Sequence, residues 1–262
     1  VEDVQILSGN LVTNGDFSQE GSELITNGDF ATDSNWTKGT GTTISGGSAN
    51  FVNADGISLY QSIGTQSGFV KVTFTVTDYT SGTLNVYSGG NQSVGTINVS
   101  ANALATYTAY VDRNAGNVNI IFGSNDSFTG SIDNVSVKEV GQDWVLQTGW
   151  SIAENKATFD ETIGGAGNIN QNNILASGKN YKLTFDTLET NGGNIAYRFG
   201  GDYTFISAIQ ANTTHTIYGV GAGVQFTLRG ADNFIGSITN ISVIEVTSDT
   251  NLPRINYDGF SY

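Results

Sequence analysis

Positive charge is scarce in this chain, and two of its arginines lie in strand-like segments where they alternate with apolar residues. Arg198 follows NIAY, and Arg229 follows QFTL. Side chains that alternate in this way point away from the core. Each guanidinium group is therefore expected to bind an acidic sugar or to pair with Asp202 or Asp232, and the sequence leaves both readings open.

Aromatic and amide side chains form a second candidate site. Tyr87 and Tyr110 are each out of phase with the apolar residues beside them, and Asn85 shares the phase of Tyr87. The three are predicted to line one polar sheet surface, where rings stack on pyranose faces and amides bind hydroxyl groups. Carbohydrate binding is the chemistry this pattern favours. The alternative is that the tyrosines are cross-strand pairs or contacts between modules.

Catalytic chemistry has little support. His215 is the only histidine, lies in the strand-like stretch THTIYG and is expected to be a half-exposed strand residue. No nucleophile-elbow motif lies near it, and the absence of cysteine excludes thiolate nucleophiles and thiolate metal sites. Paired carboxylates meet in space and not in sequence, so a polysaccharide depolymerase stays open as a minor reading. The prediction is a protein that is not an enzyme.

The overall charge narrows the classes of partner. With 24 acidic against 10 basic residues, the formal net charge is -14. Such a surface repels phosphate backbones, which argues against nucleic acid and anionic membranes as partners. The sequence has no apolar run of about 18 residues, so no membrane span is predicted.

The elements that position these residues come from an internal repeat. Residues 35–51 align with residues 143–159, pairing Trp36 with Trp144, and residues 128–140 align with residues 234–246. The chain therefore contains two modules, with a boundary near Gly141. All three tryptophans are expected to be structural and buried.

Within each module the apolar residues recur with a period of two, which is the pattern of half-buried strands. Many short alternating runs separated by glycine turns predict an all-β protein of two tandem antiparallel β-sandwich modules, jelly-roll-like in connectivity. A change of phase in the last strand of each module predicts a β-bulge at Asp133-Asn134 and at Thr239-Asn240. The alternating apolar sets are Val70, Val72, Phe74, Val76; Tyr181, Leu183, Phe185; and Val224, Phe226, Leu228.

The segment LVTNGDF at 11–17 is repeated as LITNGDF at 24–30, whereas the second module starts at Gln142 without such a segment. The predicted domains are an N-terminal segment with a spare strand (1–23), module one (24–140), module two (141–247) and a linker (248–262). The spare copy is either a relic that adds to a nearby sheet edge or a strand that pairs with an open edge of another module or subunit.

LITNGDF, the following DSNW at 33–36, and GSIDNVSV at 130–137 together resemble the carbohydrate-binding-module superfamily related to xylan- and glucan-binding jelly rolls. TNGDF followed by WTKGTG and SIDNVSVKEV looks like modules repeated in bacteriophage tail and virion proteins and in surface proteins of marine bacteria. TNLPRINY at 250–257 looks like the linker before a further lectin-like domain in such phage proteins.

This resemblance implies a structural calcium ion held by Asp29 and Asp133, although Ala31 and Thr239 depart from the family's acidic pattern. It also implies a non-catalytic adhesion or glycan-binding protein of a virion or cell surface, as in a phage tail or fibre that contacts host polysaccharide. Other virion or fibre subunits, and further copies of the chain in a homo-oligomer, are the implied protein partners. The competing reading is a purely structural spacer or decoration protein of a virion or extracellular filament.

Overall fold

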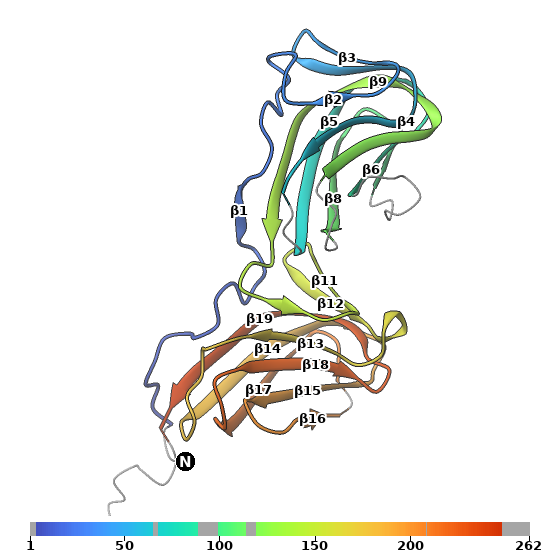
Figure 1. The fold of residues 1–262 in the computed structure, drawn as a ribbon. Coiled ribbons are helices and arrows are strands. Elements are labelled where there is room, and N and C mark those ends of the chain that lie inside the picture. Colours follow the sequence, from blue (N-terminus) through green and yellow to red (C-terminus); the bar gives the residue numbers. More distant parts are fainter. Residues whose placement is uncertain (1–3, 65–67, 89–98, 114–118, 208, 248–262) are drawn as a thin grey trace, which may run out of the picture. The chain divides into compact units, whose positions relative to one another are not determined.

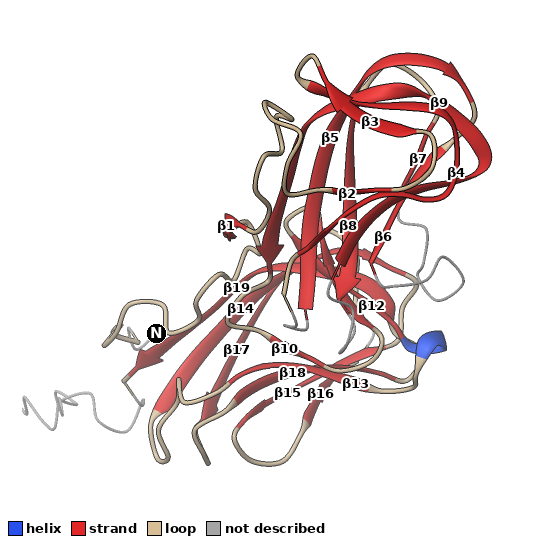
Figure 2. Ribbon diagram, turned by 45° about the horizontal axis from the view of Figure 1, so that its top comes forward, coloured by secondary structure: helices blue, strands red, loops and turns tan. Residues whose placement is uncertain are grey.

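The computed structural model describes residues 4–247, apart from 65–67, 89–98, 114–118 and 208. The described chain is built almost entirely of antiparallel strands, and its helical structure is one 3₁₀ turn, Glu161–Ile163 (Figure 2). The predicted all-β fold of two sandwich modules is therefore confirmed.

The chain divides into two compact units, and their boundaries differ from those predicted. Residues 18–142 form one unit, termed module one, and the described residues 4–17 join residues 143–247 in the other, termed module two. The N-terminal segment is thus not a separate element, because its part up to residue 17 packs with the C-terminal half of the chain. In sequence terms, module one is inserted into module two. The predicted linker, 248–262, lies outside the described residues.

Module one is a sandwich built around two long strands, β4 (Ser48–Ser62) and β9 (Asn119–Val140), which pair along most of their length. The second half of β9 also pairs with β5 (Gly68–Ser81), which pairs with β8 (Thr106–Arg113). The first half of β9 pairs with β6 (Leu84–Ser88), so β9 contributes to both layers (Figure 1). Short strands complete the edges: β1 (Glu20–Glu23) on β9, β2 (Thr37–Lys38) and β3 (Thr42–Ser45) on β4, and β7 (Val99–Ala101) on β6.

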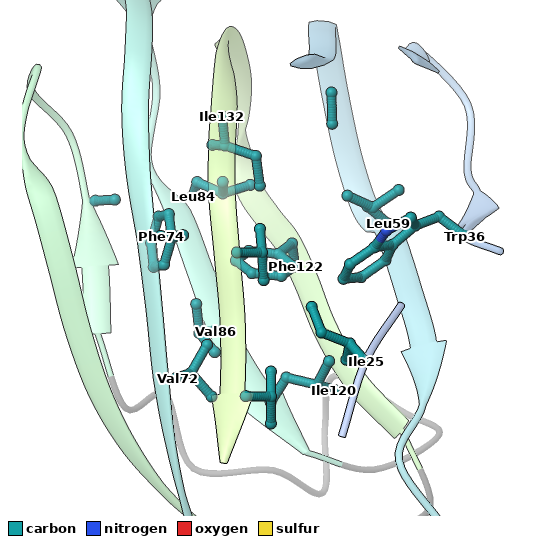
Figure 3. Packing of buried hydrophobic residues seen from close by; sticks show 14 of the residues in the cluster. Ile25, Trp36, Leu59, Val72, Phe74, Leu84, Val86, Ile120, Phe122 and Ile132 are labelled. Carbon is teal, nitrogen blue, oxygen red and sulfur yellow. The ribbon is translucent and has the colours of Figure 1, made fainter. Parts of the chain in front are cut away.

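Aromatic side chains fill the core of module one. Phe122 packs edge-on against Phe74 and Trp36, with ring centroids 5.1 and 6.2 Å apart (Figure 3). Burying one such side chain contributes about 1.5–3 kcal/mol. Trp36, Trp144 and Trp150 are all buried, which confirms their predicted structural role.

Module two divides the same plan into two separate five-stranded sheets (Figure 1). One has the order β11-β12-β19-β14-β17 and the other β10-β13-β18-β15-β16. The first sheet comprises β11 (Trp150–Ala153), β12 (Lys156–Asp160), β14 (Asn180–Thr190), β17 (Thr213–Val220) and β19 (Ile235–Val246). The second comprises β10 (Val145–Leu146), β13 (Gly167–Gln171), β15 (Asn194–Phe199), β16 (Thr204–Ile206) and β18 (Phe226–Ala231).

The predicted alternation holds in the central strands. The apolar sets of β5 and β14 are buried and the residues between them are partly exposed. Val224 is the exception, because it precedes β18 and is 54% exposed, while its carbonyl oxygen accepts hydrogen bonds from the amides of Ile174 and Leu175. It contributes a main-chain group and not a core side chain.

Both predicted β-bulges are present. Between Thr73 and Thr75 of β5, the partner residues on β9 run from Ser136 to Asp133, so β9 carries one extra residue there. The same shift occurs in β19 between the partners of Thr184 and Asp186. The extra residue adopts a positive φ of 53° in each module, at Asn134 and at Asn240. Asparagine tolerates this left-handed conformation better than most residues.

Module two takes its opening segment from residues 11–17, and module one takes its own from residues 24–30. In each segment the leucine amide donates a hydrogen bond to the closing strand, at 2.8 Å in module two and 2.9 Å in module one. Gly15 and Gly28 lie so close to that strand that an added Cβ would stand 2.0 Å from a carbonyl oxygen. Only glycine permits this approach.

Side-chain contacts of the two segments match as well. Gln171 Oε1 accepts a hydrogen bond from the Thr13 amide at 3.1 Å, and Gln171 Nε2 donates one to the Thr13 carbonyl oxygen at 2.6 Å. Gln61 holds Thr26 in the same way, at 2.8 and 3.0 Å. In both modules the indole of the first tryptophan donates to the asparagine carbonyl of the segment at 2.9 Å. The spare copy therefore serves as the opening segment of module two within the same chain.

Candidate functional site

One sheet of module two carries both predicted arginines on its outer face. Ile169 and Leu228 on neighbouring strands of this sheet are fully buried in the core, so the residues between such positions point outward. The strand register arranges the outward residues in two rows. One row is Asn168, Arg229, Ala196 and Phe205, and the other is Val145, Asn170, Thr227 and Arg198. Ala196, Asn170 and Thr227 are themselves buried, so the exposed part of the face is formed by the remaining side chains. Together with Tyr203, Asn172 and Gln225, these residues are termed the Tyr203 face.

Tyr203 crosses this face. It precedes β16 at one edge of the sheet, yet its hydroxyl donates a hydrogen bond to Asn168 Oδ1 on β13, three strands away, at 2.9 Å. The guanidinium carbons of Arg198 and Arg229 lie 4.8 and 5.0 Å from the ring centroid. Cation–π attraction to both groups and the hydrogen bond at the hydroxyl hold the ring in place. The residue is only half-buried, so part of its surface stays open to a ligand.

Arg198 is fixed by neutral polar groups. Its Nε donates to Thr227 Oγ1 at 3.2 Å, and its Nη2 donates to Gln225 Oε1 at 2.6 Å. Gln225 in turn donates through Nε2 to Asn172 Oδ1 at 2.6 Å. This chain of hydrogen bonds orients both the guanidinium and the amides beside it, which preorganises the face.

Arg229 differs from Arg198 because its guanidinium has no hydrogen-bond acceptor among the described residues. Its Nε is buried and unpartnered, and its contact is with the Tyr203 ring. A buried donor left without an acceptor costs about 1–3 kcal/mol. The arrangement therefore leaves an unused donor beside the aromatic ring.

The ion-pair reading of the two arginines is not what the structure shows. Neither arginine forms a salt bridge with a residue that the structure describes, whereas Lys156 and Lys179 on the same module both pair with glutamates. Asp232 instead accepts a hydrogen bond from Asn194 Nδ2 at 2.7 Å. The structure thus brings Arg198 and Arg229 together on one surface, where no acidic side chain of the described residues neutralises either.

The predicted tyrosine surface of module one is not assembled. Asn85 and Tyr87 do share one side of β6, but they are only 5% and 3% exposed, and Ile121 opposite Tyr87 is 1% exposed. Asn85 Oδ1 accepts a hydrogen bond from the Ser100 hydroxyl at 2.9 Å. The two side chains are covered and do not present an open surface.

Tyr110 lies elsewhere in module one. It stands on β8 opposite Lys71, and β8 pairs with β5 and not with β6. A hydrogen bond from Lys71 to Glu20 raises the pKa of Lys71, and Tyr110 adds to this shift. Tyr110 therefore belongs to a charged outer surface separate from Asn85 and Tyr87.

The predicted calcium ligands are only partly engaged. Asp29 Oδ1 accepts the Ala31 amide at 3.3 Å, and Asp133 Oδ1 accepts the Asn134 amide at 2.6 Å. No group of three or more acidic, histidine or cysteine side chains placed to hold a metal ion occurs in the described part of the chain.

The matching position in module two is informative. There the hydroxyl of Thr239 lies between two main-chain carbonyl oxygens, 3.0 Å from that of Asn155 and 3.5 Å from that of Asp16. A neutral hydroxyl thus occupies the place that Asp133 takes in the repeat of module one.

His215 is a half-buried residue of β17, as predicted. Its ring stacks on Phe185 with centroids 4.8 Å apart, and its Nε2 lies 3.2 Å from the Thr187 hydroxyl. Burial lowers the pKa of His215 below its ordinary value, and the charge of Asp186 opposes part of that shift. The contacts are those of a packed side chain.

No helix among the described residues is long and apolar enough to cross a membrane.

Sequence reasoning missed most of the Tyr203 face. Tyr203 lies in a glycine turn, where no periodicity applies, and its reach across the sheet depends on strand order. Asn168 and Asn170 alternate around buried Ile169, so that pattern was present in the sequence. Gln225 and Thr227 share the alternation that singled out Arg229, and they too could have been proposed.

No protein-family profile matches this chain, and no curated protein matches it. Among solved structures it is similar to the tandem of two CBM22 modules of Paenibacillus barcinonensis Xyn10C, with 9% identity, a TM-score of 0.37, and coverage of 87% of this chain and 99% of that one. It is also similar to a fucolectin from striped bass (Morone saxatilis) serum, with 10% identity, a TM-score of 0.30, and coverage of 85% and 99%. Saccharomyces cerevisiae allantoicase gives 8% identity, a TM-score of 0.31, and coverage of 91% and 92%. The case for a ligand rests on the side chains of the Tyr203 face.

Proposed function

We propose that this protein is a non-catalytic glycan-binding protein and that module two binds sugar through the Tyr203 face. The observation that carries the proposal is a tyrosine ring fixed across a sheet of amide and guanidinium groups. An aromatic ring packs on the apolar face of a pyranose, and the amides and guanidinium groups exchange hydrogen bonds with its hydroxyls. Because Tyr203 is held at its ring and at its hydroxyl, little ordering is needed on binding.

Module one has the structural part in this proposal. Its side chains at the equivalent sheet position, Asn85 and Tyr87, are almost inaccessible. A covered surface offers no stacking platform, so module one acts as a spacer that carries module two.

The test compares two tyrosines. Tyr203→Ala is expected to weaken binding on an array of bacterial surface glycans by about tenfold or more, because it removes a central aromatic anchor. Tyr110→Ala is the matched control, since it removes a partly exposed tyrosine from module one and should leave binding unchanged. Equal loss in both variants, or no retention of any glycan by the intact chain, would contradict the proposal.

The setting we propose is a virion or cell surface, with the chain as a component of a bacteriophage tail or fibre that contacts host polysaccharide. The support is the resemblance of the TNGDF and SIDNVSVKEV repeats to phage and bacterial surface modules. Other fibre subunits and further copies of the chain are the partners that this setting implies. Light scattering of the purified chain and antibody labelling of intact particles test it, and a strict monomer absent from particles would contradict it.

Calcium at Asp29 and Asp133 of module one is a further part of the proposal. The repeat places the carbonyl oxygens of Asp29 and Gly47 where Thr239 meets its two carbonyls in module two. A carboxylate in place of that hydroxyl repels such oxygens, and calcium, which prefers oxygen ligands, relieves the repulsion. Chelation should therefore lower the melting temperature of module one, and Asp133→Thr should abolish that response. An unchanged melting curve with chelator would overturn this part.

A further inference from the structure

We infer that the glycan bound by the Tyr203 face is acidic and that Arg229 receives its carboxylate. This inference rests on the proposed glycan-binding function and adds the class of sugar. The starting observation is the contrast between the two arginines. Arg198 has acceptors for two of its nitrogens, while Arg229 has a buried Nε without any acceptor among the described residues.

The missing acceptor of Arg229 is most simply supplied by an anion. Guanidinium is a planar fork of donors that matches the two oxygens of a carboxylate, and such charge-assisted pairs are about twice as strong as neutral hydrogen bonds. A sugar hydroxyl fills one donor at a time and leaves the charge uncompensated. Within the described part of the chain no carboxylate, including those of Asp202 and Asp232, forms an ion pair with either arginine.

The position of Arg229 beside Tyr203 fits a hexuronate in particular. When a pyranose stacks on an aromatic ring, its carboxyl group projects from the rim of the sugar ring and lies beside the platform. The guanidinium carbon of Arg229 is 5.0 Å from the ring centroid of Tyr203. A uronic acid that packs on the exposed part of Tyr203 therefore brings its carboxylate near the guanidinium of Arg229, which lies over the same ring.

The charge of the whole chain strengthens the local argument. The chain has 24 acidic and only 10 basic residues, yet two guanidinium groups without a carboxylate partner among the described residues converge on one sheet face. A net charge of -14 repels polyanions at long range. Affinity for an acidic glycan must then come from contacts at this face, where substitutions can remove it.

The experiment measures binding of the intact chain to homopolymers of galacturonate, mannuronate, guluronate and glucuronate. Each is compared with its carboxyl-reduced neutral form and with a sulfated neutral polymer, by affinity electrophoresis at physiological salt. We expect at least one polyuronate to bind about tenfold or more tightly than its reduced form, as expected for loss of a charge-assisted bidentate pair.

Two substitutions separate the fork from the charge. Arg229→Gln removes both the fork of donors and the charge, and it should abolish the preference for the polyuronate. Arg229→Lys keeps the charge but not the fork, and this variant should lose most of that preference. Lys182→Gln is the matched control, because it removes one positive charge from β14, in the other sheet of the same module, and should change nothing.

The outcomes distinguish this inference from the function on which it rests. Retention of neutral glycans as tightly as polyuronates overturns the acidic specificity and leaves glycan binding intact. Equal binding of sulfated polymer and polyuronate, with Arg229→Lys behaving as the unaltered protein, overturns the carboxylate fork. Failure to retain any polymer, on these supports and on the glycan array, overturns both.

Discussion

The two modules carry different side chains at matching positions of one sheet. Gly82 and Gly193 are equivalent positions of the two modules. Both have nearly the same φ, 78° and 80°, and a Cβ added to either would meet the backbone of a matching phenylalanine, Phe128 or Phe234. Five residues after these glycines, module one has Tyr87, which is buried. Module two has Arg198 there, and its guanidinium carbon lies 4.8 Å from the ring centroid of the half-buried Tyr203. The same scaffold thus covers this surface in one copy and carries a half-buried tyrosine with two guanidinium groups in the other.

What the modules share lies in the opening segment. Both use a glutamine clamp, a tryptophan donor and a glycine that touches the closing strand, although the segment of module two lies far upstream in the sequence. The comparison teaches that the contacts closing the sandwich are retained while outward residues diverge.

The largest effect is expected from removing residues 1–17. This deletion takes the buried side chains of Val12 and Phe17 from the core of module two and strips Gln171 of its partner. Module two should lose its thermal transition, while module one keeps its own. Calorimetry resolves the two, and a peptide of residues 4–17 added back should restore the lost transition. Two unchanged transitions would show that the segment is dispensable.

Next in size is the paired substitution of the two glycines. Gly15→Ala and Gly28→Ala each place a Cβ about 2 Å from a carbonyl oxygen of the closing strand. Forcing that strand outward should cost about 3 kcal/mol of unfolding free energy, at the upper end for overpacked sites. Denaturant unfolding should show module two destabilised in the first variant and module one in the second. A loss in the same module for both variants would refute the assignment of segments.

A smaller effect is expected from Tyr203→Phe. The substitution keeps the ring but removes its hydrogen bond to Asn168, which is worth about 1 kcal/mol. Glycan affinity should fall about fivefold, measured by calorimetric titration with the glycan that the array identifies. Tyr87→Phe is the counterpart in module one and should leave affinity unaltered, whereas a fall there would contradict the closed surface.

The smallest effect concerns acid. Burial lowers the pKa of His215, so the unfolded chain binds more protons, and module two should lose stability as pH falls below the ordinary value of 6.5. Hydrogen bonds from Lys71 and Lys138 lower the pKa of Glu20, so module one should lose stability only as pH falls below 4.5. Melting curves between pH 7 and pH 4 should show module two responding first. His215→Gln should remove the early response, and a response that persists would assign it to another group.

The fold could be predicted in detail because its signals are local. Alternation in β5 and β14 follows directly from burial of one face, and a change of phase of one residue revealed each bulge. The duplicated segment was also visible. Its destination was not, because LVTNGDF and LITNGDF carry almost the same pattern, and only spatial contacts show that residues 11–17 close module two.

The site could be predicted only in part. Arg198 and Arg229 stood out by phase and scarcity, and their convergence depends on β15 and β18 being neighbours. The prediction of an open surface at Tyr87 was wrong because a residue that points out of the sandwich is not always exposed, and Tyr87 is buried. Tyr203 was out of reach because its ring spans strands that are distant in sequence.

The insertion of one module within the other has a consequence for synthesis on the ribosome. Gly15 is made 226 residues (241 minus 15) before Ile241, the residue whose carbonyl it touches. At about 5–20 residues per second, the segment waits roughly 10–45 s for its site to be translated. From the translation of Val135, which contacts Gly28, until that of Ile241, LVTNGDF competes with LITNGDF for nascent module one, and the two differ by a single methylene, valine against isoleucine. Translation rate therefore becomes a variable that decides which copy closes which sandwich.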